Sequence, residues 1–284
     1  MTALHDPTFF VIACTMLGLV VGSFLNVVIL RVPKMMEQTW HRECCELLEQ
    51  FAPEEPVINL SHPESQCPGC GATIKPWHNV PVLSWILLRA RCASCGMPIS
   101  ARYPLVELAT GIFSGLAAWQ FGFGVEAFSA LLLIWMLIAL TGIDIDTQLL
   151  PDSLTLPLLW LGLGINLSAV WTPLSSAVIG AMLGYGILWS VYWLFKWVTG
   201  KEGMGYGDFK LLGALGAWFG WEAVPVMILL SSLVGAILGI AILLIKRQGR
   251  DTPMPFGPYL AGAGLIMLFV GDTLMNQYRA WVPL

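Results

Sequence analysis

The sequence predicts an all-α, polytopic membrane protein of about eight transmembrane helices with a small cytoplasmic insert. Three observations predict this fold class. Only 11% of the 284 residues are charged, whereas an average soluble domain has about 25%. The hydrophobic fraction is 57% and the mean hydropathy is +0.74. Long uncharged runs alternate with short polar segments, which is typical of membrane-spanning helices.

The same composition excludes several classes of protein. A soluble single-domain enzyme, a disordered chain and a small disulfide scaffold do not have this much apolar sequence. A net charge of -4 argues against a nucleic-acid partner. The 13 Trp residues fit a chain with two membrane interfaces, where indole rings settle. The lipid bilayer is therefore the first predicted partner.

The first predicted span is Phe9–Leu30, which contains no charged residue. It is too long for the apolar region of a cleaved signal and no basic residue precedes it, so we expect a retained helix. The later runs are Tyr103–Phe121, Ala127–Ile143, Leu154–Ala169, Ala177–Val198, Leu211–Phe219, Ala223–Ile245 and Phe256–Val270. A span needs about 20 apolar residues. Several runs are shorter, so six or seven spans are the alternatives to eight.

Charge supports the count of eight and orients the chain. With Met1–Thr8 outside, every cationic residue except Arg279 lies in an inner segment or, for Lys196, at the inner end of a helix. The inner segments are Arg31–Arg102, Asp144–Asp152, Thr199–Lys210 and Lys246–Asp251. This bias is typical of cytoplasmic loops, and seven spans would break it. We expect three parts: the first helix at 1–30, a cytoplasmic block at 31–102 and a transmembrane domain at 103–284.

The cytoplasmic block contains two C-x2-C pairs. They are formed by Cys67 with Cys70 and Cys92 with Cys95, each pair is followed by Gly, and 21 residues separate the pairs. Two such knuckles can offer four thiolates to one tetrahedral zinc ion, and a closed site of this kind is structural rather than catalytic. A redox pair or unligated thiols are the alternatives, but disulfides are disfavoured in the cytosol. The sequence therefore predicts a zinc-bound insert.

The other thiols and the histidines of this region have simpler interpretations. Cys14 lies in the first span and is expected to be a packing residue. Cys44 and Cys45 are adjacent and have no partner pair, so we expect surface thiols. The histidines of the block are expected to be loop residues rather than ligands, because four cysteines already fill a zinc site; they are His41, His62 and His78.

Acidic residues at the membrane edge are the candidates for chemistry. Asp144, Asp146 and Asp152 follow the third span, and Asp208 precedes the sixth, within Gly203–Lys210. Ionisable groups at membrane depth are costly and are functional candidates by default. Two carboxyls brought together from different helices would share a proton, so that one could deprotonate a water while the other polarises a peptide carbonyl. Glycines before Asp208 would allow a substrate strand to approach.

Each aspartate also has a structural alternative. Asp208 could cap a helix that begins near Phe209, Asp152 could cap the next helix after Pro151, and Asp146 could be a solvated loop charge. Two other classes of function compete with a peptidase. A transporter could use the same aspartates as proton or cation carriers, although no broken helices in matched halves are evident. An assembly factor without chemistry is the third possibility.

Several motifs in order resemble the type IV prepilin peptidases, the membrane aspartic proteases also called leader peptidase/N-methyltransferases. The resemblance covers essentially the full chain. Its motifs are the segment Gly22–Arg31, the two C-x2-C pairs, the Arg102-Tyr-Pro-Leu-Val-Glu107 segment, the Asp144–Asp152 loop, the Gly203–Lys210 loop and Pro255-Phe-Gly-Pro-Tyr259.

The resemblance implies an endopeptidase of the bacterial inner membrane. Its members cut the basic leader from type IV prepilins and type II secretion pseudopilins after a Gly, at the cytoplasmic face. The family's two catalytic aspartates correspond to Asp144 and Asp208, with Asp146 as the reserve candidate. We expect the apolar helix of the substrate to lie in the bilayer and its leader to lie near Asp144, Asp146, Asp152 and Glu202.

The resemblance also implies a second activity. Many members methylate the new N-terminal amine with S-adenosylmethionine, and the intact cysteine block favours this activity here. No residue can be assigned to that cofactor, because the sequence has no Gly-rich turn after a strand. Glu107 is an acid within an apolar run, and we expect it to orient either a substrate amine or a neighbouring helix.

Overall fold

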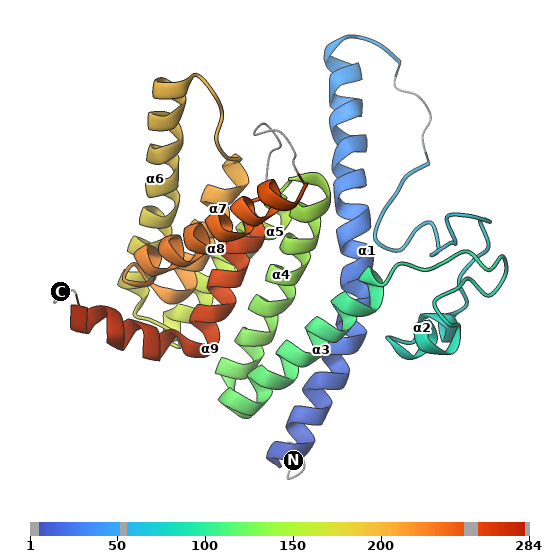
Figure 1. Ribbon diagram of the computed structural model, residues 1–284, viewed down its shortest axis with the longest axis horizontal. Helices are drawn as coiled ribbons and strands as arrows, with labels where there is room; N and C mark the ends of the chain where they lie inside the picture. The colour runs from blue at the N-terminus through green and yellow to red at the C-terminus, as the bar shows by residue number, and fades with distance from the viewer. Residues whose placement is uncertain (1–5, 52–55, 247–254, 282–284) are drawn as a thin grey trace. The chain divides into compact units, whose positions relative to one another are not determined.

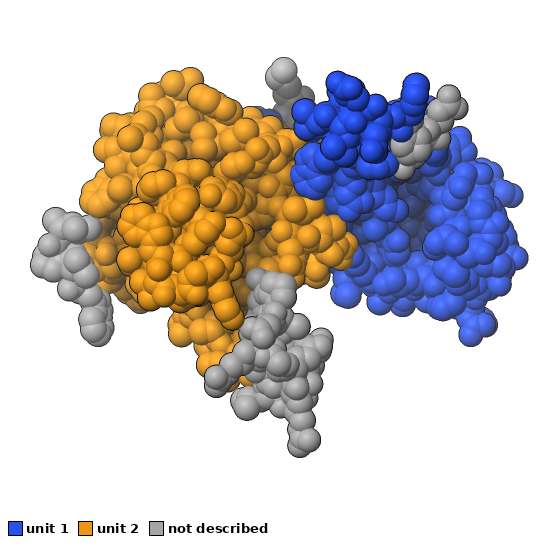
Figure 2. Space-filling view, turned by 90° about the horizontal axis from the view of Figure 1, so that it is seen from above, with its two compact units in different colours: residues 1–123 blue, residues 124–284 orange. Residues whose placement is uncertain are grey.

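The computed structural model describes residues 6–51, 56–246 and 255–281, and these residues form helices joined by loops without any extended strand (Figure 1). They divide into two compact units, residues 1–123 and residues 124–284 (Figure 2). The all-helical prediction is therefore confirmed. The division of the chain at 30 and 102 stays a prediction.

The first unit is built on two long helices. Helix α1 spans Pro7–Leu47. Its N-cap is Asp6, whose carboxylate accepts hydrogen bonds from the backbone N–H groups of Thr8 and Phe9. Helix α3 spans Arg102–Phe121. The insert between them contains a 3-10 turn, η2, at Pro76–Asn79, and a short helix, α2, at Leu83–Leu87.

Small residues allow α1 and α3 to pack closely. Gly18 and Gly22 of α1 face α3: a Cβ at Gly18 would lie 2.7 Å from Cβ of Ser114, and one at Gly22 would lie 2.7 Å from Cα of Glu107. Gly111 of α3 meets the Leu19 side chain in the same way. Glycines four residues apart are the usual device for close helix packing in membranes. The pair of helices therefore forms a rigid support for the insert.

The second unit places one helix at its centre. Its helices are α4 (Val125–Thr147), α5 (Asp152–Ile165), η3 (Asn166–Ser168), α6 (Leu174–Thr199), α7 (Tyr206–Phe219), α8 (Ala223–Lys246) and α9 (Gly257–Trp281). From Asp208 to Trp218, all residues of α7 except Lys210 are buried. A helix that is apolar on all sides is a core helix. Helix α7 is therefore the element around which the others pack.

Polar contacts hold the far end of α7 in place. The Trp218 indole donates to the carbonyl of Leu158 at 2.9 Å. The Asn166 amide donates to the carbonyls of Ala217 and Trp218, which are the last turn of α7, and its oxygen accepts the N–H of Trp171. Buried polar groups are satisfied in this way, because an unpaired one would destabilise the fold.

Five helices of the described chain are long and apolar enough to cross a membrane: α1, α4, α6, α8 and α9. The protein is therefore multi-pass. Each of the eight predicted runs overlaps a helix, but α7 has 14 residues, about 21 Å at 1.5 Å per residue, against a hydrocarbon core of about 30 Å. The count of eight spans stays a prediction.

Several helices run beyond the limits expected from hydropathy. Helix α1 continues past Leu30 and through Pro33 to Leu47, so the first part of the block expected at 31–102 belongs to the same helix as the first span. Helix α4 continues to Thr147 and α7 begins at Tyr206. Hydropathy marks where a helix becomes polar, not where its backbone hydrogen bonds end. Helix α9 has a kink at Val270, where φ is -130°.

Candidate functional site

Asp144 lies in the last turn of α4, not in the loop that the sequence suggested. Its side chain is buried, and its Oδ2 accepts a 2.9 Å hydrogen bond from the backbone N–H of Gly257. Gly257 is the first residue of α9. The carboxylate therefore faces the N-terminus of a helix, where backbone N–H groups stabilise negative charge. A Cβ at Gly257 would lie 2.7 Å from the same oxygen.

Asp208 lies in the first turn of α7 and is also buried. It is the third residue of a helix that begins at Tyr206, so it is not the N-cap that the sequence allowed. Its Oδ2 nevertheless accepts the N–H of Gly205, the N-cap residue, at 3.2 Å. This bond is the acidic half of a capping box. Like Asp144, this carboxylate is held at a helix N-terminus.

The structure brings the two carboxylates into one neighbourhood. They are close enough for a Coulombic interaction between their charges. Leu150 fills the space beside them: a Cβ at Gly207 would lie 2.5 Å from its Cβ, and one at Gly257 would lie 3.1 Å from its Cδ2. Two buried acids at short range cannot both be charged without cost, so they favour a state with a shared proton.

The other acids of the first loop have different surroundings. Asp146 is exposed, two residues after Asp144. Asp152 is the first residue of α5, whose N-cap is Pro151 and not an aspartate. Both oxygens of Asp152 accept hydrogen bonds from the Lys210 ammonium, at 2.6 and 2.8 Å. The expected capping role of Asp152 is therefore wrong, and its charge is matched by a residue two positions from Asp208.

Glu202, in the segment before α7, is also paired. Its carboxylate accepts a 2.8 Å hydrogen bond from Lys196 of α6, and this bond lowers the pKa of Glu202 below its usual range. Lys196 also reaches the Tyr192 hydroxyl at 3.3 Å. Of the four acids expected to lie near the leader, Asp152 and Glu202 are thus engaged by lysines.

The four predicted cysteines form one cluster in the first unit. One thiol sulfur from each of Cys67, Cys70, Cys92 and Cys95 lies within 4.8 Å of all the others. The Sγ atoms of Cys67 and Cys95 are 3.8 Å apart. With Zn–S bonds of about 2.3 Å, two sulfurs of a tetrahedral site are separated by about 3.8 Å. The donor set and its spacing therefore fit a tetrahedral, thiophilic metal ion.

The two cysteine pairs have the same local backbone. Gly71 donates its N–H to the carbonyl of Cys67, and Gly96 does the same to Cys92, each at 2.9 Å. Both glycines have a positive φ, 67° and 73°, which favours Gly over all other residues. This arrangement turns both sulfurs of a pair to one side, as the spacing predicted.

The remaining thiols divide into buried and exposed. Cys14 is buried in α1, as expected of a packing residue, and Cys44 is exposed. Cys45 is buried, so the expectation of a surface thiol there is wrong: the helix turns it by about 100° from its neighbour. Within the described residues the metal-ligand group consists of the four cysteines, and none of the three histidines of the block belongs to it.

Glu107 connects α3 to the insert. Its side chain is 7% exposed, and its Oε2 accepts the N–H of Val82 at 2.8 Å. It also interacts with the Ser23 side chain of α1. Val82 has a φ of 60°, in the left-handed region that a β-branched residue rarely adopts. The carboxylate thus holds a strained turn of the insert against the α1–α3 pair.

Sequence reasoning missed two residues of the aspartate site. The Pro255–Tyr259 motif was noticed without a role, and the structure shows that its Gly257 binds Asp144. The available signal was a Gly followed by Pro258, at the first positions of a helix. Lys210 was noticed only as a cation of an inner loop, and its partner Asp152 is 58 residues away along the chain.

Two family models match the chain, one in each unit. The model described as the bacterial peptidase A24 N-terminal domain matches residues 16–121. The model described as the type IV leader peptidase family matches residues 131–240. The first range contains the cysteine cluster and Glu107, and the second contains both buried aspartates. No solved structure matches the chain.

Curated relatives match over nearly the whole length. A protein of Stutzerimonas stutzeri named prepilin leader peptidase/N-methyltransferase is 55% identical over 98% of this chain and 97% of its own. One of the same name in Pseudomonas aeruginosa is 55% identical over 96% of this chain and 94% of its own. One in Legionella pneumophila, also of that name, is 46% identical over 97% of this chain and 96% of its own.

Proposed function

Because the chain belongs to the type IV leader peptidase family, we propose that Asp144 and Asp208 are the catalytic pair of its peptidase. The enzyme is a prepilin leader peptidase and N-methyltransferase: it cleaves the leader from prepilins and methylates the N-terminus that cleavage exposes. The observation that carries the residue assignment is the burial of both carboxylates at helix N-termini, close enough to interact.

The proposed chemistry is acid–base catalysis by two carboxyls. One carboxylate takes a proton from a water, whose oxygen attacks the scissile carbonyl, and the protonated carboxyl donates to the developing oxyanion. The carbon–nitrogen bond then breaks as the leaving nitrogen takes the proton that the first carboxylate removed from the water, and the new carbonyl returns its proton to the second carboxylate. The N–H groups of Gly257 and Gly205 hold the two carboxylates in fixed orientations. A charge fixed in advance costs little reorganisation during the reaction.

Substrate binding divides between lipid and water. The apolar helix of a prepilin would lie among the spans, and its basic leader would lie in the aqueous phase beside the aspartates. Asp146 is exposed two residues from Asp144 and is the acid we assign to leader recognition. We therefore expect Asp146→Asn to raise KM for prepilin more than it lowers kcat.

The cysteine cluster is proposed to be a structural zinc site. Four thiolates close the coordination shell and leave no position for a substrate, so the ion would fold the insert rather than take part in cleavage. Methylation needs S-adenosylmethionine as the methyl donor. The amine nitrogen would form a bond to the methyl carbon while the bond from that carbon to sulfur breaks, and the nitrogen would lose a proton.

The location of the reaction follows from charge. The four inner segments, which include Asp144, Asp208 and the cysteines, together carry 12 of the 14 Lys and Arg residues, so we place them on the cytoplasmic face of the inner membrane. Type II secretion pseudopilins, which present the same leader and apolar helix, are proposed as further substrates. A proton- or cation-coupled transporter, the alternative from the sequence, is not supported by the relatives' names.

The test uses the full chain purified and reconstituted in liposomes with a prepilin. We expect mass spectrometry to detect the shortened pilin, and its methylated form when S-adenosylmethionine is added. Asp144→Ala should abolish both products, because the amine is created by cleavage. A proton or cation flux that depends on Asp144, without any cleaved product, would contradict the peptidase and favour the transporter.

A further inference from the structure

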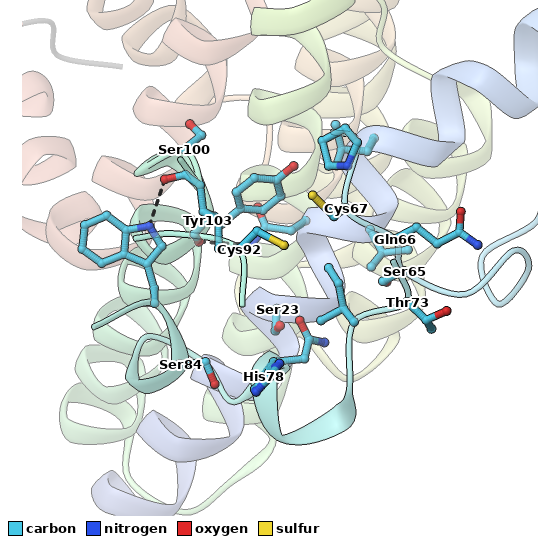
Figure 3. Close-up of a pocket in the computed structure, with 18 of the residues that line it drawn as sticks. Ser23, Ser65, Gln66, Cys67, Thr73, His78, Ser84, Cys92, Ser100 and Tyr103 are labelled. Carbon is cyan, nitrogen blue, oxygen red and sulfur yellow. Dashed lines mark hydrogen bonds between the residues drawn. The ribbon is translucent and has the colours of Figure 1, made fainter. Parts of the chain in front are cut away.

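A cavity lies in the first unit, and its lining residues fall between Ser23 and Glu107 in the sequence. Its volume is about 550 Å³, within the range of about 300–1,000 Å³ that small-molecule and cofactor sites occupy. Its walls come from α1, from the insert and from the first turns of α3. In Figure 3 the Cys67 and Cys92 thiols and Tyr103 lie toward one end, and Ser23, His78 and Ser84 toward the other.

The lining of this cavity carries both signs of charge. Arg31 and Lys34 of α1 contribute cations, and Glu107 of α3 contributes a carboxylate. The Arg31 guanidinium is fixed by a 2.9 Å hydrogen bond to the carbonyl of Asn59 in the insert, and it also donates to the carbonyl of Pro63. Glu64 of the insert adds a second carboxylate to the lining. A ligand with both an anionic and a cationic group would be complementary to these charges.

Glu107 is the residue that points most clearly to a ligand. Its carboxylate is buried, yet its interactions are with the Val82 N–H and Ser23, and no cationic side chain of the described chain forms an ion pair with it. A carboxylate can accept about four hydrogen bonds. A buried negative charge without a counter-charge is destabilising, and a bound cation would offset that cost.

The cavity also offers a flat apolar surface. The ring of Trp85 is fixed, because its indole N–H donates to the carbonyl of Ile99 at 3.2 Å. Leu88 and Ile99 also line the cavity. A planar aromatic group, such as a purine base, would be bound by such a surface, with the backbone groups of the insert available for hydrogen bonds.

We propose that this cavity binds S-adenosylmethionine, with Glu107 as the counter-charge to its sulfonium and with Arg31 and Lys34 beside its carboxylate. The proposal rests on the methyltransferase activity of the proposed function and gives that activity a site. It also explains why the cysteine cluster belongs to the enzyme: Cys67 and Cys92 line the cavity, so the fold of the insert forms part of its wall.

Binding, rather than turnover, tests the proposal. Equilibrium dialysis of the purified full-length protein in detergent would measure the affinity for S-adenosylmethionine and for S-adenosylhomocysteine, whose sulfur is uncharged. Glu107→Gln keeps an acceptor oxygen for Val82 but removes the charge. We expect it to weaken S-adenosylmethionine binding about tenfold and S-adenosylhomocysteine binding no more than about threefold, since a buried charge contact is worth about one decade in affinity. Glu43→Gln, at an exposed position of α1 outside the lining, is the matched control.

A second variant does not depend on Glu107. Ala93 is an exposed residue of the cavity lining, so the Trp side chain in Ala93→Trp should fill the cavity. The affinity for both ligands should fall at least tenfold. Ala101→Trp adds the same bulk at an exposed residue outside the lining and should leave both affinities unchanged. Zinc content would verify that the insert is intact.

The possible failures can be told apart. Wild type that binds S-adenosylmethionine, together with unchanged affinities in Glu107→Gln and Ala93→Trp, would overturn the site and leave the methyltransferase function standing. If Glu107→Gln lowered the affinity for both ligands equally, Glu107 would not be the counter-charge to the sulfonium and its role would be in folding alone. Wild type that binds neither ligand would overturn the site and the methyltransferase function together.

Discussion

The backbone N–H of Gly257 donates a 2.9 Å hydrogen bond to Oδ2 of Asp144, joining the start of α9 to the last turn of α4. The bond is buried and connects residues 113 positions apart in the sequence. The bond places the Asp144 carboxylate at the N-terminal, positive end of the α9 dipole, although Asp144 itself lies at the C-terminal, negative end of α4. Helix α9 is therefore part of the proposed catalytic site.

Replacing Gly257 should impair cleavage without removing any acidic group. In Gly257→Ala the new Cβ would lie 2.7 Å from Oδ2 of Asp144, so the carboxylate must move. A displacement of about 1 Å at a catalytic group can cost about 100-fold in rate, and we expect kcat for prepilin to fall at least tenfold. Gly262→Ala is the control, because its Cβ would meet nothing within 4 Å. Equal rates for the two variants would contradict this role.

The pair formed by Lys210 and Asp152 should contribute modestly to stability. Its side chains are 27% and 57% exposed, so solvent screens the interaction. A double-mutant cycle with Lys210→Gln and Asp152→Asn, followed by thermal unfolding in detergent, should give a coupling of about 0.5–1 kcal/mol that falls with added salt. Strictly additive effects would show that the two residues are independent in solution.

The close packing of α1 on α3 should depend on glycine. Gly18→Leu would place atoms against Ser114 and the carbonyl of Thr110. We expect a loss of at least about 1–3 kcal/mol, typical of overpacking, measured as lower thermal stability of the purified protein. Gly186→Leu in α6 meets open space and serves as the control. A Gly18→Leu protein as stable as the control would mean that α1 and α3 do not pack as described.

Removal of one cluster cysteine should release the metal. Cys67→Ser and Cys92→Ser should each lower zinc from about one ion per chain to less than half, because three thiolates hold the ion poorly. The insert should also become more sensitive to protease. Cys44→Ser, at an exposed thiol outside the cluster, should keep its zinc. Unchanged metal content in the cluster variants would show that these thiols are not its ligands.

The sequence predicted features that depend on near neighbours. Each C-x2-C-Gly unit specifies its own turn, so the positive φ of Gly71 and Gly96 and the meeting of four thiols follow from local spacing. Apolar runs identified the helices, because burial in lipid or protein leaves a strong compositional signal. Boundaries were less accurate: α1 passes through Pro33, a residue that usually ends a helix.

Contacts between residues far apart in the sequence could not be predicted from sequence patterns. The aspartates were recognised as candidates, but the partners Gly257 of Asp144 and Lys210 of Asp152 follow from how α4, α5, α7 and α9 pack, whereas Gly205 caps the helix that carries Asp208. Only one of these three, Gly205, is a near neighbour of the acid it binds. Glu107 was expected to orient either a substrate amine or a neighbouring helix, and its bond to Val82 could not be predicted because it depends on the fold of the insert.

The most direct measurement compares prepilin cleavage in membranes by wild type, Asp144→Asn and Asp208→Asn, with Asp272→Asn, an exposed acid of α9, as the control. Both Asn variants at the buried positions should insert normally and leave the prepilin uncut, because a pair that moves one proton between its members fails when either loses its acid. Asp272→Asn should cut at the wild-type rate. Normal cleavage by either Asp144→Asn or Asp208→Asn would contradict the proposed pair.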